Sequence, residues 1–352
     1  MKTTKEVKIG NIAIGNGNAI AIQSMTNTKT ADKEATLAQI KELAAAGCDI
    51  VRFTVNDMAA AEAIPFYVEN STIPLVADIH FDYKLALAAA ERGIHKIRIN
   101  PGNIGDKENI KRVANACMMK NIPIRIGING GSCEKSLLEK YGGPTAEALA
   151  ESALSNARML EECDFDNIVL SVKSSDVKTM VKAARILNEK CNYPLHIGVT
   201  ETGDVRRGSI KSAIGIGGLL IDGIGDTVRV SLTEDPVLEI AAAKDILFCS
   251  GIGGGVNIVS CPTCGRTQSD VIPLVAELER RTRDIKTAKR ITVALMGCAV
   301  NGPGEAREAD IGIAGGIGEG LIFKKGQIIK KVPQEQLFDA LIAEIKSMSK
   351  EV

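Results

Sequence analysis

Ala46-Gly47-Cys48-Asp49-Ile50-Val51-Arg52 and Arg92-Gly93-Ile94-His95-Lys96-Ile97-Arg98 follow one pattern. In each stretch a glycine ends an alanine-rich helical pattern, a short apolar strand follows, and an arginine stands at the fifth position after the glycine. Glycine is the residue that most easily ends a helix, because the left-handed conformation there costs it nothing. The pattern predicts a helix-to-strand transition that recurs along the chain.

The same alternation of apolar strands and amphipathic helices extends over about 250 residues, the usual length of a (β/α)8 barrel. We expect strands near residues 19–25, 49–55, 74–79, 96–100, 123–129, 167–173, 195–200 and 226–232. A short hairpin over residues 7–15 comes before them. An open doubly wound sheet is the alternative, but Gly251 to Gly255 follows a helix and does not resemble its nucleotide-binding fingerprint.

The pattern changes after that glycine-rich linker. Residues 257–260 and 290–296 have the character of strands, 269–283 of a helix, and 312–331 of glycine-rich hairpins. A closing helix has one apolar face, formed by Leu337, Leu341, Ile345 and Met348. The sequence therefore predicts an α/β protein of two domains, a TIM barrel over residues 1–250 and a smaller α+β domain over residues 251–352.

Three cysteines stand out in the smaller domain. Cys261 and Cys264 share a turn that contains proline, and Cys298 follows in a loop rich in glycine and proline. A structural zinc site needs four Cys or His ligands, whereas an iron-sulfur cluster accepts three thiolates and an oxygen ligand on the fourth iron. Glu305, seven residues after Cys298, can supply that oxygen. A zinc knuckle that uses Cys249, or three buried thiols, are the alternatives.

Side-chain parity on the predicted strands indicates which residues face the barrel lumen. The inward cations are Arg52, Arg98, Arg125, Lys173 and Arg229. The acids expected near them are Asp78 and, just after the seventh strand, Glu201. Unpaired buried charge is costly, so this excess of positive charge predicts an anionic ligand, a phosphate or diphosphate.

Composition excludes other classes of protein. Lys and Arg number 43 and Asp and Glu also 43, and tryptophan is absent, which argues against a nucleic-acid or membrane-surface protein. The first residues carry charges without an apolar segment, so we expect no signal peptide and no membrane span. Nine cysteines at irregular spacings suit a reducing, cytoplasmic compartment.

Several motifs together carry a resemblance to a known family. They are CPTCGR, ALMGCAVNGPGEA, IQSMTNT, VRFTV, ADIHF, KIRINPGN, RIGINGGS, HIGVTETG and IGDTVRVSLTEDP. With them the chain resembles the bacterial, two-domain 4-hydroxy-3-methylbut-2-enyl diphosphate synthases of the non-mevalonate isoprenoid pathway. The resemblance covers essentially the whole chain.

The resemblance implies reductive ring opening and dehydration of a cyclic diphosphate, 2-C-methyl-D-erythritol 2,4-cyclodiphosphate. It implies a homodimer, reduced flavodoxin or ferredoxin as electron donor, and a [4Fe-4S] cluster held by Cys261, Cys264, Cys298 and Glu305. Glu201 is implied as the proton donor, and Glu305 also as a catalytic ligand. The implied substrate contacts are Arg52, Asp78, Arg98, Asn100, Arg125, Asn129, Lys173, Arg229 and Ser231.

Two other functions remain open from the residues alone. An iron-sulfur hydro-lyase acting on a phosphorylated diol would use the same ligand set without external electrons. A non-catalytic phosphate-binding barrel with a zinc knuckle would contain zinc and no sulfide.

Overall fold

The structure is a computed structural model and describes residues 2–265, 267, 270–283, 285, 287–298, 306–315 and 318–351. The chain divides into two compact units, Met1–Ser250 and Gly251–Val352. No helix in the described parts of the chain is long and apolar enough to span a membrane.

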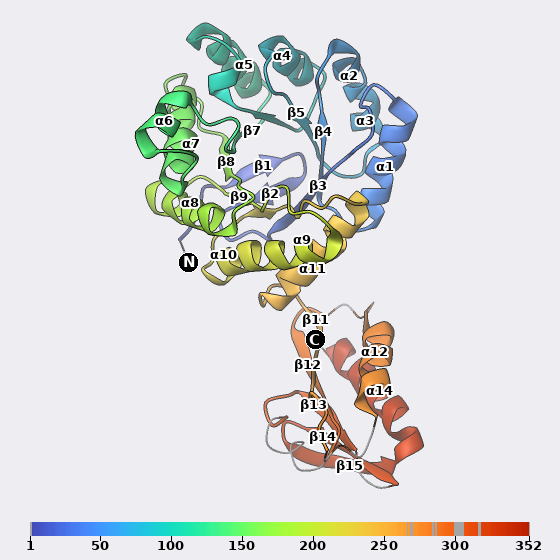
Figure 1. Ribbon diagram of the computed structural model, residues 1–352. Helices are drawn as coiled ribbons and strands as arrows, with labels where there is room; N and C mark the ends of the chain where they lie inside the picture. Colours follow the sequence, from blue (N-terminus) through green and yellow to red (C-terminus); the bar gives the residue numbers. More distant parts are fainter. Residues whose placement is uncertain are drawn as a thin grey trace. The chain divides into compact units, whose positions relative to one another are not determined.

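Eight parallel strands form the barrel of the first unit (Figure 1). The strands are β3 (Ala21–Met25), β4 (Ile50–Thr54), β5 (Leu75–Asp78), β6 (Lys96–Ile99), β7 (Ile124–Ile128), β8 (Ile168–Val172), β9 (His196–Ile197) and β10 (Thr227–Val228). Their order is β8-β7-β6-β5-β4-β3-β10-β9, and a bridge between Leu170 and Leu195 joins the two ends. The predicted barrel is therefore confirmed.

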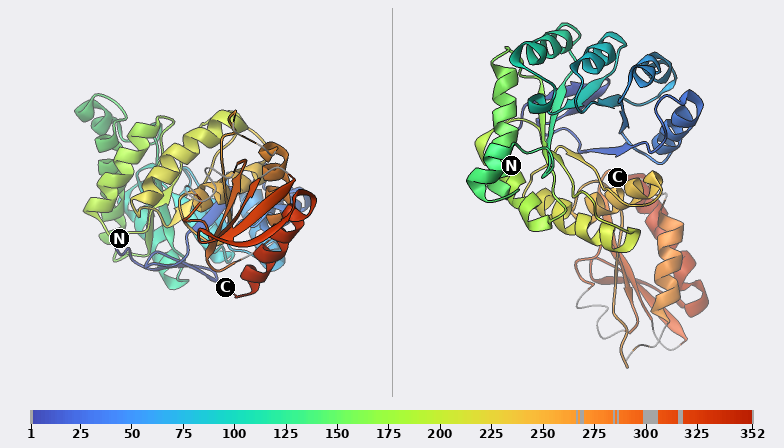
Figure 2. Two further views of the ribbon diagram at one scale, coloured as in Figure 1. Left: turned by 90° about the horizontal axis from the view of Figure 1, so that it is seen from below. Right: turned by 45° about the horizontal axis from the view of Figure 1, so that its top comes forward.

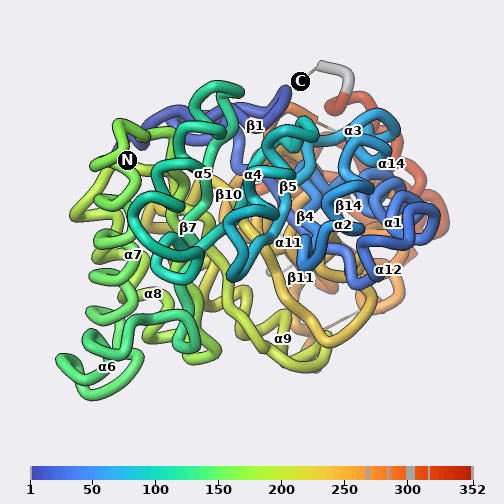
Figure 3. The backbone as a smooth tube through the Cα atoms, turned by 90° about the horizontal axis from the view of Figure 1, so that it is seen from above, coloured from blue at the N-terminus to red at the C-terminus, as the bar shows by residue number. Residues whose placement is uncertain are grey.

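The helices form a ring outside these strands (Figure 1), and in the view from above α4 and α5 lie in front of the strands (Figure 3). They are α1 (Lys33–Ala45), α2 (Met58–Glu62), α3 (Ile64–Asn70), α4 (Tyr83–Glu91), α5 (Lys107–Met119), α6 (Lys135–Tyr141), α7 (Ala146–Glu161), α8 (Val177–Lys190), α9 (Val205–Ser212), α10 (Gly218–Ile221) and α11 (Pro236–Cys249). A 3₁₀ turn lies at Pro101–Asn103 and a π-helical turn at Ala213–Gly217.

Aspartates determine where many of these helices begin. An N-cap carboxylate accepts a backbone N–H that would otherwise have no partner in the first turn. This cap is present at Asp32, Asp57, Asp82, Asp106, Asp176, Asp204 and Asp235. Gly47 and Gly93, which end the two motifs' helices, have φ of 90° and 83°, as predicted for a glycine helix end.

The seventh and eighth strands are shorter than the sequence predicts. β9 and β10 pair with each other at only two positions, and β10 also pairs with β3 at two. Beyond Val228 the chain continues to Leu232 without further strand pairing, although its apolar residues alternate. Strand pattern alone does not reveal where hydrogen-bond pairing stops.

The floor of the barrel is a hairpin. β1 (Val7–Ile9) and β2 (Ile12–Ile14) pair antiparallel, as predicted. Ile9 and Ile14 are fully buried and belong to one apolar cluster with Ile50, Val76 and Val169 from the barrel strands. This cluster closes the lumen at the amino ends of the strands and leaves the carboxyl ends for the site.

We predict that Ile9→Ala destabilises the barrel by about 3 kcal/mol, because a fully buried side chain leaves a cavity when it is truncated. Urea unfolding followed by circular dichroism measures the loss. The matched control is Ile12→Ala on the same hairpin, since Ile12 is only partly buried. Equal losses for the two variants would show that the hairpin is not the floor.

The second unit is a mixed sheet with two helices. Its strands are β11 (Gly255–Ser260), β12 (Arg290–Met296), β13 (Ile311–Gly315), β14 (Glu319–Lys324) and β15 (Gln327–Pro333), and its helices are α12 (Val271–Thr282) and α14 (Gln334–Glu351). β11, β12 and β13 are parallel, whereas β14 and β15 add antiparallel.

Both helices pack on one face of this sheet (Figure 2). Leu337, Leu341 and Ile345 of α14 and Leu278 of α12 are buried in one cluster with the sheet's valines and isoleucines. Three of the four residues predicted for the apolar face of α14 are thus fully or almost fully buried. This packing positions the carboxyl ends of β11 and β12, where two of the three motif cysteines follow.

Candidate functional site

Asp78 is the centre of the polar network in the barrel mouth. Its carboxylate lies 3.4 Å from Nε of Arg52 and 3.1 Å from Nη1 of Arg98. Burial alone would raise the pKa of the Asp78 carboxyl, but the two guanidinium groups outweigh burial and lower that pKa to about 2. Asp78 therefore stays ionised and fixes two of the predicted cations.

Gly127 leaves room for the guanidinium group of Arg98. Nη2 of Arg98 donates to the carbonyl oxygen of Gly127, 2.9 Å away. A Cβ atom on Gly127 would lie 2.5 Å from Nε of Arg98, a distance that no real Cβ contact has. The glycine on β7 thus lets the guanidinium cross the lumen.

Arg125 is the least compensated of the cations. Its side chain is 1% exposed, and its Nε and Nη1 atoms have no hydrogen-bond acceptor among the described residues. Burial and the nearby charges of Arg52 and Arg98 lower the pKa of Arg125 well below its usual value. Donors buried without acceptors are costly and are expected where a ligand supplies the acceptors.

Lys173 and Lys96 add two further cations. The ammonium group of Lys173 lies beside Gly198, where a Cβ atom would come within 3.3 Å of Nζ. Burial, followed by repulsion from Arg229 and Arg52, lowers the pKa of Lys173 well below its usual value. Lys96 is fully buried, and its ammonium group donates to a neutral acceptor, Oε1 of Gln23, at 3.3 Å.

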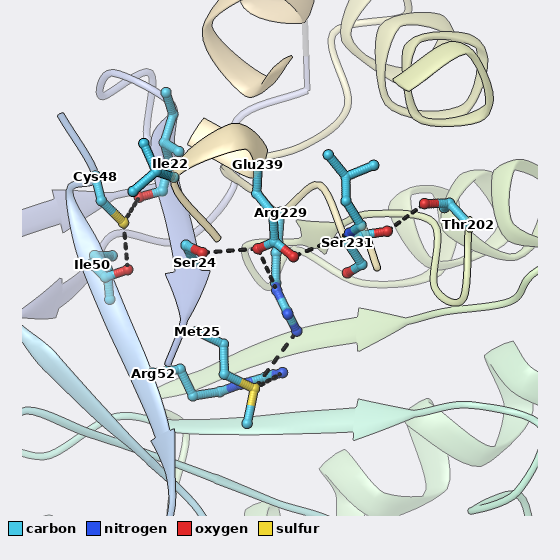
Figure 4. Close-up of polar contacts among 12 residues, drawn as sticks. Ile22, Ser24, Met25, Cys48, Ile50, Arg52, Thr202, Arg229, Ser231 and Glu239 are labelled. Atoms are coloured by element: carbon cyan, nitrogen blue, oxygen red, sulfur yellow. Dashed lines mark hydrogen bonds and ion pairs between the residues drawn. The ribbon is translucent and has the colours of Figure 1, made fainter. Parts of the chain in front are cut away.

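Arg229 connects the network to the helix behind the sheet (Figure 4). Its Nε lies 3.5 Å from Oε2 of Glu239 on α11, and its Nη1 lies 3.8 Å from the sulfur of Met25. The same sulfur accepts from Nε and Nη2 of Arg52, at 3.2 and 3.0 Å. Five predicted cations thus approach one region, and the carboxylates paired with them in the described structure are Asp78 and Glu239.

The remaining predicted contacts surround this cluster. Asn100 is buried, donates to the carbonyl oxygen of Ser132 and accepts from Gly102 N–H, so it shapes the loop. Asn129 is exposed and its Oδ1 accepts from Ser132 N–H. Oγ of Ser231 is buried without a partner among the described atoms.

Glu201 lies exposed just after β9, with a φ of 53°. This left-handed backbone is unusual for a residue other than glycine, and it is seen where the surrounding loop imposes it. In the described structure the second carboxylate beside the cations is Glu239, which the sequence analysis missed.

The motif cysteines lie at the carboxyl end of the second unit's parallel strands. Ser260 pairs with Leu295, so Cys261 and Cys298 follow neighbouring strands. Gly297 N–H donates to the sulfur of Cys261 at 3.3 Å. Cys261 is partly buried, Cys298 is 7% exposed, and Cys264 is exposed.

The Cys261–Cys264 turn is held by Thr267. Thr267 exchanges two hydrogen bonds with Cys264, each of 2.9 Å. Gly297 approaches this turn so closely that a Cβ atom would lie 2.7 Å from a carbon of Thr267. Thr263, inside the turn, has a φ of 55°. Glu305, the predicted oxygen ligand, lies outside the described residues.

The sulfur atoms of the motif cysteines are the donor atoms that an iron-sulfur cluster takes. A cluster binds each thiolate to a different iron, and N–H donors to its sulfurs are a usual feature. Cys261, Cys264 and Cys298, with the Gly297 N–H bond to Cys261, have the chemistry of such a donor set.

Family models match both units, a GcpE TIM-barrel domain over residues 4–244 and a GcpE protein C-terminal domain over residues 257–347. The chain belongs to the GcpE family. A relative from Clostridium perfringens, named 4-hydroxy-3-methylbut-2-en-1-yl diphosphate synthase (flavodoxin), is 60% identical over 348 residues, 99% of each chain. Another of that name, from Geobacter sulfurreducens, is 54% identical and covers 98% of each chain.

The barrel also resembles solved structures of other proteins. A type I 3-dehydroquinate dehydratase from Clostridium difficile superimposes with a TM-score of 0.52 and 17% identity, over 70% of this chain and 97% of that one. At this identity the likeness shows the fold alone.

We predict that Arg125→Met leaves the ligand-free protein as stable as the wild type or more stable by about 1–3 kcal/mol, because it removes an unpaired buried charge. The same variant loses the rise in unfolding temperature that inorganic diphosphate gives the wild type. Thermal unfolding with and without diphosphate measures both effects. A large loss of stability in the ligand-free variant would show that Arg125 is already paired.

We predict the opposite for Asp78→Asn, which leaves Arg52 and Arg98 without their carboxylate and costs about 3–5 kcal/mol at neutral pH. Because the pKa of Asp78 is lowered from 3.8 to about 2, its contribution is present above pH 3.8 and is lost as the pH falls toward 2. Urea unfolding of both proteins between pH 7 and pH 3 measures the difference. A difference that grows on acidification would contradict the ion pairs.

Proposed function

We propose that this protein converts 2-C-methyl-D-erythritol 2,4-cyclodiphosphate to 4-hydroxy-3-methylbut-2-enyl diphosphate. The observation that carries the proposal is the excess of cations over carboxylates in the barrel mouth, where Arg125 is buried with two donor atoms that have no acceptor among the described residues, in a chain 60% identical to a relative named for this synthase. The reaction takes up two electrons and one proton, opens the bond between carbon and a ring phosphate oxygen, and releases one hydroxyl group with that proton as water.

The barrel residues bind and orient the diphosphate in this proposal. Arg52, Arg98, Arg125, Lys173 and Arg229 supply donors, and Arg forks suit phosphate oxygens. The other proposed substrate contacts are Asp78, Asn100, Asn129 and Ser231. Ring opening adds one negative charge to the diphosphate, so the excess of positive charge stabilises the product side more than the substrate side.

Protonation of the leaving hydroxyl group is assigned to Glu201. Its exposed position on the loop after β9 is at the carboxyl end of the barrel, the end where barrel active sites lie. A carboxyl group there can hold the proton that leaves with the hydroxyl as water.

Cys261, Cys264, Cys298 and Glu305 would hold a [4Fe-4S] cluster. The cluster supplies one-electron transfer and a Lewis-acidic iron for a substrate oxygen. Reduced flavodoxin is the proposed donor, as the relatives' names indicate, and ferredoxin is the alternative. A homodimer is proposed as well, as the resemblance to the family implies. Nine cysteines suit a reducing cytoplasm.

Turnover of the cyclic diphosphate by anaerobically purified protein, with and without reduced viologen, tests the proposed function. We expect the linear allylic diphosphate only with reductant. Product formation without reductant would indicate a hydro-lyase. No product from protein with intact iron and sulfide would refute the substrate.

Glu201→Gln is expected to keep its iron and sulfide and to lose turnover by about a hundredfold or more, the usual size of general acid catalysis. Cys298→Ser is the matched control, because it is expected to lose the cluster itself. Iron, sulfide and turnover assays separate the two. Full activity in Glu201→Gln would remove the proton-donor role.

A further inference from the structure

Glu239 is a buried carboxylate beside the site, and it is not among the site residues predicted from the sequence. It lies in the first turn of α11 and is 4% exposed. Its Oε2 accepts from the Ser24 hydroxyl at 2.8 Å, and its Oε1 accepts from Leu232 N–H at 3.1 Å. Nε of Arg229 lies 3.5 Å from Oε2 (Figure 4). A single carboxylate therefore joins three segments of the barrel.

These contacts lie beside a short strand pairing of the barrel. β10 pairs with β3 only at Thr227–Ala21 and Val228–Ile22. After these pairs β3 continues to Met25. The segment that follows β10, from Arg229 to Leu232, does not pair with β3. The Glu239 carboxylate accepts one donor from each side of this gap, and so it holds the two segments together where the strands do not.

The same carboxylate fixes one end of a chain of charged groups. Arg229 lies between Glu239 and the sulfur of Met25, and Arg52 lies between that sulfur and Asp78. A thioether is a weak, uncharged acceptor, so it cannot hold two guanidinium groups by itself. The two carboxylates therefore determine where both arginines point.

Ser231 depends on Glu239 as well. The Leu232 N–H that Glu239 accepts belongs to the peptide that follows Ser231, and the carbonyl oxygen of that peptide accepts from the Thr202 hydroxyl. The Ser231 hydroxyl is left buried without a partner among the described atoms. The peptide that follows Ser231 is thus held at both its N–H and its carbonyl group, and the Ser231 hydroxyl is available to a ligand.

We propose that Glu239 is a positioning residue for diphosphate binding, which fixes Arg229 and Ser231 toward the ligand without touching it. Ser24, its hydroxyl donor, alternates on β3 with Gln23 and Met25, whose side chains reach lumen residues. Ser24 therefore faces the helices, and Glu239 lies on that side of the strand. The inference rests on the proposed function in assigning the diphosphate to this mouth.

The test compares full-length anaerobic holoenzymes. Glu239→Gln removes the charge that holds Arg229 and is expected to raise KM for the cyclic diphosphate about tenfold, with kcat changed less than about twofold. In an Arg229→Ala background the same substitution is expected to change KM less than about twofold, because the group it positions is gone.

Asp226→Asn is the matched control. Asp226 is a partly buried carboxylate at the other end of β10, where it accepts from Leu195 N–H at 2.7 Å and from the Thr4 hydroxyl at 2.8 Å. Asp226 holds separate segments of the barrel together by hydrogen bonds, as Glu239 does, but it forms no ion pair with Arg229. We expect Asp226→Asn to lower the unfolding temperature and leave KM unchanged.

Three results would overturn the proposal: an unchanged KM in Glu239→Gln, an equal rise in KM with and without Arg229, or an equal rise in Asp226→Asn. If Glu239→Gln does not fold, Ser24→Ala replaces it, since it removes only the donor that fixes Oε2. We then expect a rise in KM of about threefold that disappears in the Arg229→Ala background.

Inorganic diphosphate separates this inference from the proposed function. Its affinity for each holoenzyme, measured by calorimetry, is expected to follow the same ratios as KM. A wild type that binds inorganic diphosphate but does not turn over the cyclic diphosphate would refute the function and leave the Glu239 comparison valid. Equal affinities of wild type and Glu239→Gln would refute the inference whatever the substrate.

Discussion

Uncompensated positive charge inside the barrel is the constraint on which the site depends. Arg125 is buried with two donor atoms that have no acceptor among the described residues, and Arg52 and Arg98 share one carboxylate. Buried charge is tolerated only when it is paired or when a ligand pairs it. The unpaired cations therefore destabilise the ligand-free barrel, and a bound anion removes this cost, which adds to the free energy of binding.

The fold supports this charge at both ends of the lumen. Below, the β1–β2 hairpin and the cluster of Ile50, Val76 and Val169 exclude water. Above, glycines on β7 and in the segment after β9 leave room for Arg98 and Lys173. At the gap between β3 and β10, Glu239 replaces missing strand hydrogen bonds with bonds of its own. A few carboxylates thus both hold the cations of the site and stabilise the barrel, a double role that the apolar core does not have.

The sequence predicts more of the fold than of the site. Regular alternation of strand and helix predicted all eight barrel strands, because parity and glycine helix ends are local signals. Alternation of side chains along the strands also predicted that Arg52, Arg98, Arg125, Lys173 and Arg229 face the lumen. It missed Glu239 and Met25, because a contact between a helix residue and a strand residue far away in the chain has no local periodicity. Lys96 is two residues before Arg98 on the same face of β6, so the same alternation would also have predicted that Lys96 faces the lumen.

Calorimetric binding of the cyclic diphosphate to the wild-type protein, repeated at several salt concentrations, tests whether the site depends on unpaired cations. The account predicts binding that weakens as salt increases, and no binding of the uncharged parent tetrol 2-C-methyl-D-erythritol. Equal affinity for the charged and uncharged compounds, or affinity independent of salt, would contradict a site built on unpaired cations.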